Sequence, residues 1–217
     1  MIKHVLFDVD GTLTEPSEGI LNAVLYALPR MGIETPANLD AMKALIGPPF
    51  QFALQQFFSL TPEQARHMTD IYREYYSVRG LFEAYVYDGI PALLKGLQDH
   101  GILLHTATSK PIEYVERLLP HFDLRSYFTF LAADDLAGTR HSKPEVIRYL
   151  LEHVPDITPE NTVMVGDRKY DVLAAREFGI RTVGCAWGHA PAGELEEVGA
   201  AFIARTPAEA ERIILSL

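Results

Sequence analysis

Cysteine and long apolar runs are both scarce in this sequence of 217 residues. Cys185 is the only cysteine, so the chain cannot close an internal disulfide or build a cysteine-based zinc site. The apolar run at residues 5–7 is interrupted at once by Asp8, and no stretch approaches the roughly 18 apolar residues of a membrane-spanning helix. We therefore expect a cytoplasmic protein without a targeting or membrane segment.

Basic residues are outnumbered: 19 Lys and Arg stand against 29 Asp and Glu, for a formal net charge of -10. A nucleic-acid or anionic-membrane partner would require a basic face, so we expect neither. An anionic small molecule remains compatible, because a bound divalent cation reverses the local field. The Gly-x-x-x-x-Gly-Lys-Ser/Thr and Gly-x-Gly-x-x-Gly patterns are missing too, which leaves P-loop and dinucleotide-binding hypotheses without support.

Short apolar runs alternate with helical patterns along most of the chain. The runs, each followed by small or polar residues, lie at 5–7, 102–104, 130–133, 163–165, 182–185 and 201–204. Between them, helical periodicity covers residues 91–97, 114–119, 146–151 and 171–178. This alternation predicts an α/β fold with a doubly wound, mostly parallel sheet whose ligands bind at the carboxyl ends of the strands.

Residues 14–87 break this alternation. They contain long helical patterns and no convincing strand, and they are too long for a simple crossover. We interpret this stretch as an insert after the first strand. The predicted organisation is an α/β core domain at 1–14 and 88–217 and a smaller, all-helical cap domain at 15–87.

The most informative motif follows the first predicted strand. Asp8 and Asp10 are two residues apart, so in an extended chain their side chains project to the same side. Two such carboxylates repel each other unless a cation or proton intervenes, and an all-oxygen site suits Mg²⁺. Gly11 lets the backbone turn sharply after the pair. A solvated Asp-Gly turn is the alternative interpretation.

Residues 8–14, Asp-Val-Asp-Gly-Thr-Leu-Thr, resemble the first motif of the haloacid dehalogenase superfamily of phosphohydrolases. The resemblance extends along the whole chain and implies a Rossmann-like core with a helical cap. In that family the first Asp attacks phosphorus, and the second acts as general acid and base. The resemblance therefore implies these roles for Asp8 and Asp10.

The second motif lies at Thr108 and Ser109, at a predicted strand end just before a helix. A hydroxyl and free N–H groups at such a place can bind phosphate. Thr106 would share the strand face with Thr108, so the choice of Thr108 rests on the resemblance. For Ser109, a simple N-cap of the following helix is the alternative.

The third and fourth motifs are Lys143 and the run Gly166 to Asp171. By resemblance, Lys143 binds the phosphoryl group and steadies the nucleophile, although an isolated lysine is usually a surface residue. Asp167 would ligate Mg²⁺ together with Asp8 and the Asp10 carbonyl. Asp171 either orients the site through other groups or simply favours the start of a helix.

These motifs predict a Mg²⁺-dependent phosphatase that hydrolyses small phosphate monoesters, acting as a monomer or homodimer. Residues 87–90, 108–111 and 168–172 resemble the 5'-nucleotidase-like branch; phosphoglycolate phosphatase and sugar phosphomutase are the alternatives. The run at 47–50 resembles a cap loop that contacts substrate, or it is a rigid connector. Cap aromatics could stack on a base or form the cap core: Tyr26, Phe50, Phe52, Phe57, Phe58, Tyr72, Tyr75 and Tyr76.

Two other classes of protein fit less well. A signalling receiver also places a phosphorylated Asp on a doubly wound sheet, but receivers are shorter and lack the large insert. A silent binding protein on this fold would be expected to have lost at least one of the motif residues, and none is missing.

Overall fold

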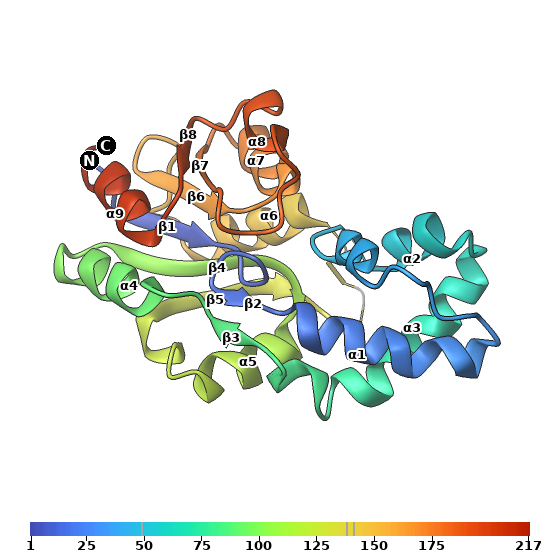
Figure 1. The fold of residues 1–217 in the computed structure, drawn as a ribbon. Helices are drawn as coiled ribbons and strands as arrows, with labels where there is room; N and C mark the ends of the chain where they lie inside the picture. Colours follow the sequence, from blue (N-terminus) through green and yellow to red (C-terminus); the bar gives the residue numbers. More distant parts are fainter. Residues whose placement is uncertain (49, 138, 141) are drawn as a thin grey trace. The chain divides into compact units, whose positions relative to one another are not determined.

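The computed structural model spans residues 1–217 and describes all of them except Pro49, Gly138 and His141. The chain forms two compact units (Figure 1). Residues Met1–Glu15 and Val86–Leu217 make the larger unit, and Pro16–Tyr85 make the smaller one. The predicted functional division into core and cap at 1–14, 15–87 and 88–217 stays a prediction.

The larger unit is built on a six-stranded sheet with the strand order β5-β4-β1-β6-β7-β8. Every neighbouring pair in it is parallel. Its strands are β1 (His4–Phe7), β4 (Leu103–Pro111), β5 (Phe128–Asp134), β6 (Thr162–Gly166), β7 (Arg181–Cys185) and β8 (Phe202–Ala204). The predicted doubly wound, mostly parallel α/β sheet is therefore confirmed. Central strand β1 is buried along its whole length, as its unbroken apolar run predicts.

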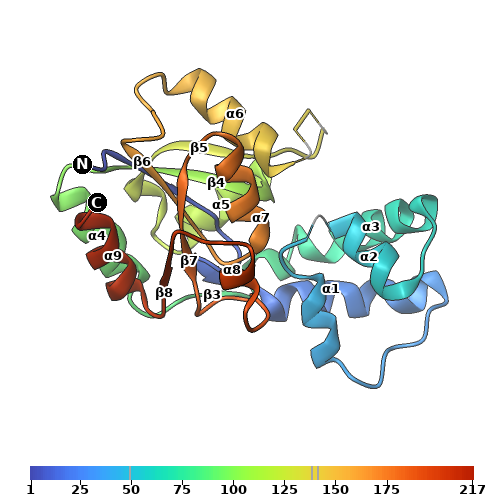
Figure 2. The ribbon, with the colours of Figure 1, turned by 90° about the horizontal axis from the view of Figure 1, so that it is seen from above.

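Helices cover both faces of this sheet: α4 (Ile90–Asp99), α5 (Ile112–His121), α6 (Lys143–His153), α7 (Lys169–Glu177) and α9 (Pro207–Leu215), with short α8 (Glu194–Glu197) and η4 (Arg125–Tyr127). Helix α6 packs beside α7, and α4 packs beside α9 (Figure 2). Leu6 of β1 and Met164 of β6 contribute to the core on the α6 and α7 side. Of the helices that the structure describes, none is long and apolar enough to cross a membrane.

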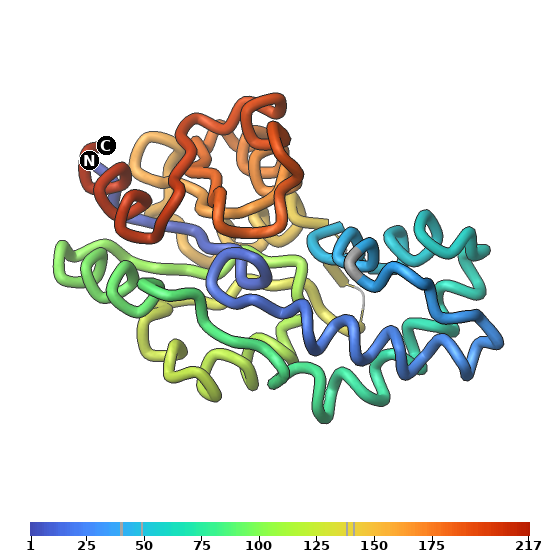
Figure 3. The backbone as a smooth tube through the Cα atoms, viewed as in Figure 1, coloured from blue at the N-terminus to red at the C-terminus, as the bar shows by residue number. Residues whose placement is uncertain are grey.

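Both chain termini lie close together in the larger unit, near the amino end of β1 (Figure 3). Because the strands are parallel, their carboxyl ends all meet at the opposite edge of the sheet. At that edge Asp8 follows β1 and Asp167 follows β6, and Thr108 lies near the end of the adjacent strand β4.

The smaller unit is helical, with α1 (Ser17–Ala27), η1 (Leu28–Met31), η2 (Asp40–Leu45), α2 (Phe50–Phe58), α3 (Pro62–Tyr76) and η3 (Gly80–Phe82). Helix α1 packs against α3 and η3. Gly19 and Gly80 permit that approach, because a Cβ on Gly19 would lie 1.8 Å from the Gly80 carbonyl oxygen. One expectation is corrected: two-residue strands β2 (Thr14–Glu15) and β3 (Tyr85–Val86) pair within the stretch expected to lack strands.

Two histidines are buried inside the sheet of the larger unit. His4 on β1 and His105 on β4 are 2% and 0% exposed, and His4 Nδ1 lies 3.1 Å from His105 Nε2. Burial and, to a smaller extent, the neighbouring His4 together lower the pKa of His105 to about 4. The pKa of His4 is also lowered by burial, against the opposing effect of Asp156. The folded state therefore favours two neutral rings.

We expect the buried pair of His4 and His105 to destabilise the folded protein in acid. A folded-state pKa below the unfolded value means that stability is lost as the pH falls below about 6.5. His105 alone should contribute a loss of about 2–3 kcal/mol between pH 7.5 and 4.5. Urea unfolding of the wild type and of His105→Asn over this range checks the expectation, because Asn cannot be protonated. Parallel pH profiles for the two proteins would contradict it.

Candidate active site

The site begins where β1 ends. Asp8 follows Phe7 directly and is 8% exposed. Its Oδ1 accepts a hydrogen bond of 2.8 Å from Val9 N–H, and its own N–H donates to the Val165 carbonyl at the end of β6. The Asp8 carboxylate is therefore held by its own loop, while Oδ2 remains directed to other partners.

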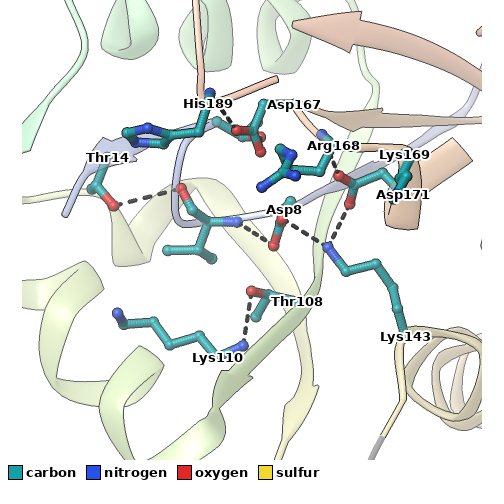
Figure 4. Close-up of polar contacts among 12 residues, drawn as sticks. Asp8, Thr14, Thr108, Lys110, Lys143, Asp167, Arg168, Lys169, Asp171 and His189 are labelled. Carbon is teal, nitrogen blue, oxygen red and sulfur yellow. Dashed lines mark hydrogen bonds and ion pairs between the residues drawn. The ribbon is translucent and has the colours of Figure 1, made fainter. Parts of the chain in front are cut away.

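Lys143 is the partner of Asp8 Oδ2. Its Nζ lies 2.7 Å from this oxygen and also forms an ion pair with Asp171. In Figure 4 the Lys143 ammonium lies between the Asp8 and Asp171 carboxylates. Lys143 is the first residue of α6, whose start Ser142 fixes through a reciprocal capping box with Glu145. The side chain is 6% exposed, so the surface-lysine alternative is wrong.

The charge state of Lys143 is set by these carboxylates. Burial alone would lower the pKa of Lys143, but Asp171 and Asp8 outweigh it and raise that pKa above its ordinary value. Lys143 is thus a permanent cation beside Asp8. It neutralises part of the charge that would repel an incoming anion.

Asp167 and Asp171 come from the end of β6 and the first turn of α7. Together with Asp8 they are buried, and their ligand atoms lie within 4.8 Å of one another. Burial and the charge of Asp8 raise the pKa of Asp167 to about 6. Burial also raises the pKa of Asp171 to about 7, although Lys143 opposes the shift.

Asp171 has both of the roles that the sequence left as alternatives: it favours the start of a helix and it orients a site residue. Its Oδ2 accepts from Arg168 N–H at 3.0 Å and completes the capping box of α7. Its Oδ1 binds Lys143, so it also orients the lysine that contacts Asp8. One side chain therefore starts a helix and organises the site.

The three carboxylates fit a hard divalent cation. Like charges this close, in a buried position, are unfavourable unless a cation or protons compensate them, as the raised pKa values of Asp167 and Asp171 show. Oxygen donors of this kind are what Mg²⁺ prefers. Asp8 and Asp171 both contact Lys143, whereas no described ion pair joins Asp167 to a lysine.

Thr108 and Ser109 lie within β4, which continues to Pro111. Thr108 is buried and its Oγ accepts from Lys110 N–H at 3.2 Å. Thr106 instead donates to the Ala132 carbonyl inside the sheet, so it is structural. Helix α5 begins only at Ile112, and the alternative that Ser109 caps it is wrong because strand β4 runs past Ser109.

Asp10 differs from the geometric expectation. Strand β1 ends at Phe7, so Asp8 and Asp10 are not successive positions of one strand face. Within the described part of the chain, the group of converging carboxylates contains Asp8 but not Asp10. The Asp10 carboxylate instead binds Lys110, whose Nζ lies 3.0 and 2.9 Å from its two oxygens. Sequence reasoning missed Lys110 entirely.

A loop after β7, to which the sequence alone assigned no role, contacts Thr12 of the first motif and Asp167. Trp187 Nε1 donates to the Thr12 carbonyl at 3.1 Å, and His189 N–H donates to Asp167 Oδ2 at 2.8 Å. Between them, a Cβ on Gly188 would lie 2.3 Å from the Asp167 Cβ and 2.4 Å from the Gly11 carbonyl oxygen. Gly11 itself has φ of 81°, where a side chain would be strained.

The aromatic candidates of the smaller unit divide by burial. Tyr72 and Tyr76 are 7% and 4% exposed and stack on each other, so they belong to its core. Tyr75 donates to Glu83 within the same unit at 2.7 Å. Phe52 is 53% exposed. The predicted cap loop at 47–50 includes Pro49 and so lies partly outside the described residues.

A buried Asp nucleophile candidate, a fixed lysine and an acidic cluster at the carboxyl edge of a parallel sheet define a phosphohydrolase-type site. The model of the haloacid dehalogenase-like hydrolase family matches residues 5–185. The chain belongs to this family, and it is a phosphoric monoester hydrolase of the haloacid dehalogenase type.

Three similar proteins illustrate the range of the family. A 5'-nucleotidase from Pseudomonas aeruginosa is 38% identical over 192 residues, 88% of this chain and 86% of the relative. The tyrosine-protein kinase PtkA from Mycobacterium tuberculosis is 35% identical over 199 residues, 92% of this chain and 67% of the relative. The crystal structure of a predicted phosphatase from Clostridium acetobutylicum matches with a TM-score of 0.95 and 37% identity, over 100% of both chains.

We expect Gly188→Ala to disturb the site. The new Cβ meets Asp167 and backbone, which cannot move aside cheaply, so unfolding free energy should fall by about 1–3 kcal/mol. Phosphatase activity should fall more than this loss of stability explains, because Asp167 must shift. Thermal unfolding and turnover of the purified variant check both effects.

Gly96→Ala is the matched control. In helix α4 its Cβ would meet only the carboxylate end of Glu211, a flexible side chain. Replacing a helical glycine by alanine contributes roughly 0.5–1 kcal/mol of stability, so this variant should be as stable and as active as the wild type, or slightly more stable. Equal behaviour of the two variants would contradict the role assigned to Gly188.

Proposed function

We propose that the protein hydrolyses small phosphate monoesters through an aspartyl-phosphate on Asp8, with nucleoside 5'-monophosphates as its preferred substrates. The observation that supports it most is the 2.7 Å contact of buried Lys143 with Asp8, in a chain of this family.

In the first half-reaction, an Asp8 carboxylate oxygen attacks phosphorus while the bond from phosphorus to the leaving oxygen breaks. Asp10 gives its proton to that leaving oxygen. Lys143, Thr108 Oγ and Ser109 N–H hold the non-bridging oxygens and spread their charge. Lys143 also keeps Asp8 ionised and in place.

In the second half-reaction, ionised Asp10 takes a proton from water as the water oxygen adds to phosphorus. The bond between phosphorus and Asp8 breaks, which releases inorganic phosphate and restores the carboxylate. Asp8, the Asp10 carbonyl and Asp167 would hold a Mg²⁺ ion, which supplies charge neutralisation at the phosphoryl oxygens. Asp171 holds the Lys143 ammonium in place through their ion pair.

Substrate selection is assigned to the helical unit, because the core residues named above contact only phosphate. The 5'-nucleotidase relative supports a nucleoside monophosphate. Of the aromatic side chains of that unit, Tyr72 and Tyr76 are buried, whereas Phe52 is 53% exposed and accessible to a planar ring. Phosphoglycolate and sugar phosphates are the competing substrates.

A tyrosine kinase function is the second candidate, favoured by the relative of that name. The two functions differ in the group that accepts the phosphoryl from Asp8, which is water in one and a phenol in the other. Incubation with ATP and a tyrosine-containing peptide separates them. We expect no phosphotyrosine, while a nucleoside 5'-monophosphate under the same conditions releases inorganic phosphate.

Asp8→Asn should abolish turnover, because an amide is a poor nucleophile. We expect a loss of at least about 10³-fold in kcat with p-nitrophenyl phosphate, and unchanged thermal stability, since Lys143 keeps Asp171. The matched control is Asp99→Asn, which breaks an exposed ion pair with Lys95 and should leave kcat unchanged. Near-normal activity of Asp8→Asn rules the mechanism out.

Substrate preference is tested by phosphate release from nucleoside 5'-monophosphates, phosphoglycolate and sugar phosphates in Mg²⁺ buffer. We expect kcat/KM to be highest for the nucleotides and to fall for them in Phe52→Ala. Isomerised sugar phosphate without release would indicate a mutase. A flat, weak profile would contradict the substrate assignment while leaving the phosphatase mechanism intact.

A further inference from the structure

Lys110 and Asp10 form a second lysine–carboxylate pair beside that of Lys143 and Asp8. The Lys110 side chain is 3% exposed, and its Nζ contacts both oxygens of Asp10, at 3.0 and 2.9 Å. The Asp10 side chain is 22% exposed, so one side of the pair remains open. A buried ammonium is unfavourable unless it is paired, and this pair supplies the compensation.

The fold brings Lys110 to this place. Phe7, the last residue of β1, lies opposite Thr106 of β4, so Thr108 and Lys110 extend beyond the end of β1. The register of β4 against β5 shifts between Thr108 and Pro111, so strand alternation is not regular here. Lys110 N–H donates to Thr108 Oγ at 3.2 Å, which keeps the two residues beside each other, as Figure 4 shows. The loop with Asp10 occupies the same region, where Thr14 Oγ also contacts Asp10 Oδ1 at 3.5 Å.

The two lysines do not share a carboxylate. Lys143 contacts Asp8 and Asp171, whereas Lys110 contacts Asp10. A contact to a single oxygen would leave the Asp10 carboxylate free to rotate about its last bond. Contacts to both oxygens fix its plane, so the oxygen that exchanges a proton keeps one direction.

We propose that Lys110 is a positioning residue that aims the Asp10 carboxylate at the leaving oxygen and then at the attacking water. This inference rests on the proposed function, in which Asp10 transfers both protons. Lys110 forms and breaks no covalent bond. It acts only through Asp10, and its removal should impair the proton-transfer steps more than binding or attack by Asp8.

The test varies the leaving group. Phenyl and p-nitrophenyl phosphate have similar size, but p-nitrophenolate leaves without a proton, whereas phenolate benefits from one. In Lys110→Met we expect kcat/KM to change by less than about 3-fold for p-nitrophenyl phosphate and to fall by about 10²-fold for phenyl phosphate. Because dephosphorylation also needs Asp10, p-nitrophenyl phosphate should show a burst followed by slow turnover.

A double-variant cycle shows whether Lys110 acts through Asp10. Asp10→Asn should give the same leaving-group dependence, and adding Lys110→Met to it should lower kcat/KM no further. Lys95→Met, at an exposed ion pair, is the matched lysine control and should match the wild type. Circular dichroism checks folding; if Lys110→Met unfolds, Lys110→Gln carries the same measurements.

An equal loss for both esters, or an additional loss in the double variant, would overturn the inference. These outcomes differ from failure of the proposed function. If the proposed function failed, the wild type would not release phosphate, or Asp8→Asn would still release it. Neither result depends on the residue at position 110.

Discussion

The site depends on the electrostatic compensation of three carboxylates that are buried together. Asp8, Asp167 and Asp171 approach within 4.8 Å, a distance at which like charges in a protein interior are unfavourable. Lys143 offsets part of this by contacting Asp8 and Asp171. This compensation is incomplete, because burial raises the pKa of both Asp167 and Asp171, even though Asp171 contacts Lys143. A divalent cation is the natural compensation there.

Parallel topology explains how residues far apart in sequence reach one place. Strands β4, β1 and β6 are adjacent and parallel, so their carboxyl ends meet at one edge. Asp8 and Asp167 directly follow β1 and β6, and Thr108 lies near the end of β4. Lys143 arrives from the crossover between β5 and β6, where Ser142 fixes the first turn of α6. Each motif needs only its own strand end to be correctly placed.

The sequence was sufficient to predict the parallel sheet and to place Asp8 and Asp167 at its carboxyl edge, because both depend on local patterns. Apolar runs mark buried strands, and polar residues after them mark the ligand edge. The role of Lys110 could not be read this way, since its contact with Asp10 depends on how far β4 extends beyond β1. One available signal was its position two residues after Thr108.

Gly188 shows a second kind of limit. Its local sequence does not reveal that its Cα lies against Asp167 and Gly11, which are 21 and 177 positions away in the chain. Such a contact is a property of the assembled loop. The same reason explains the error at Asp10, where an extended strand was assumed but β1 ends at Phe7. Patterns locate the ends of elements better than the loops beyond them.

The overall charge of the chain is a poor guide to the field at this site. The net charge is -10, yet two lysines are buried beside the two carboxylates assigned to the chemistry. Arg168 adds a third buried cation, held by Glu194 at 2.8 Å. Exposed acidic residues are screened by water and salt, whereas these cations act at short range in a less polar environment. An acidic protein can therefore bind an anion, provided that its few buried cations and a metal ion are placed where the anion meets the nucleophile.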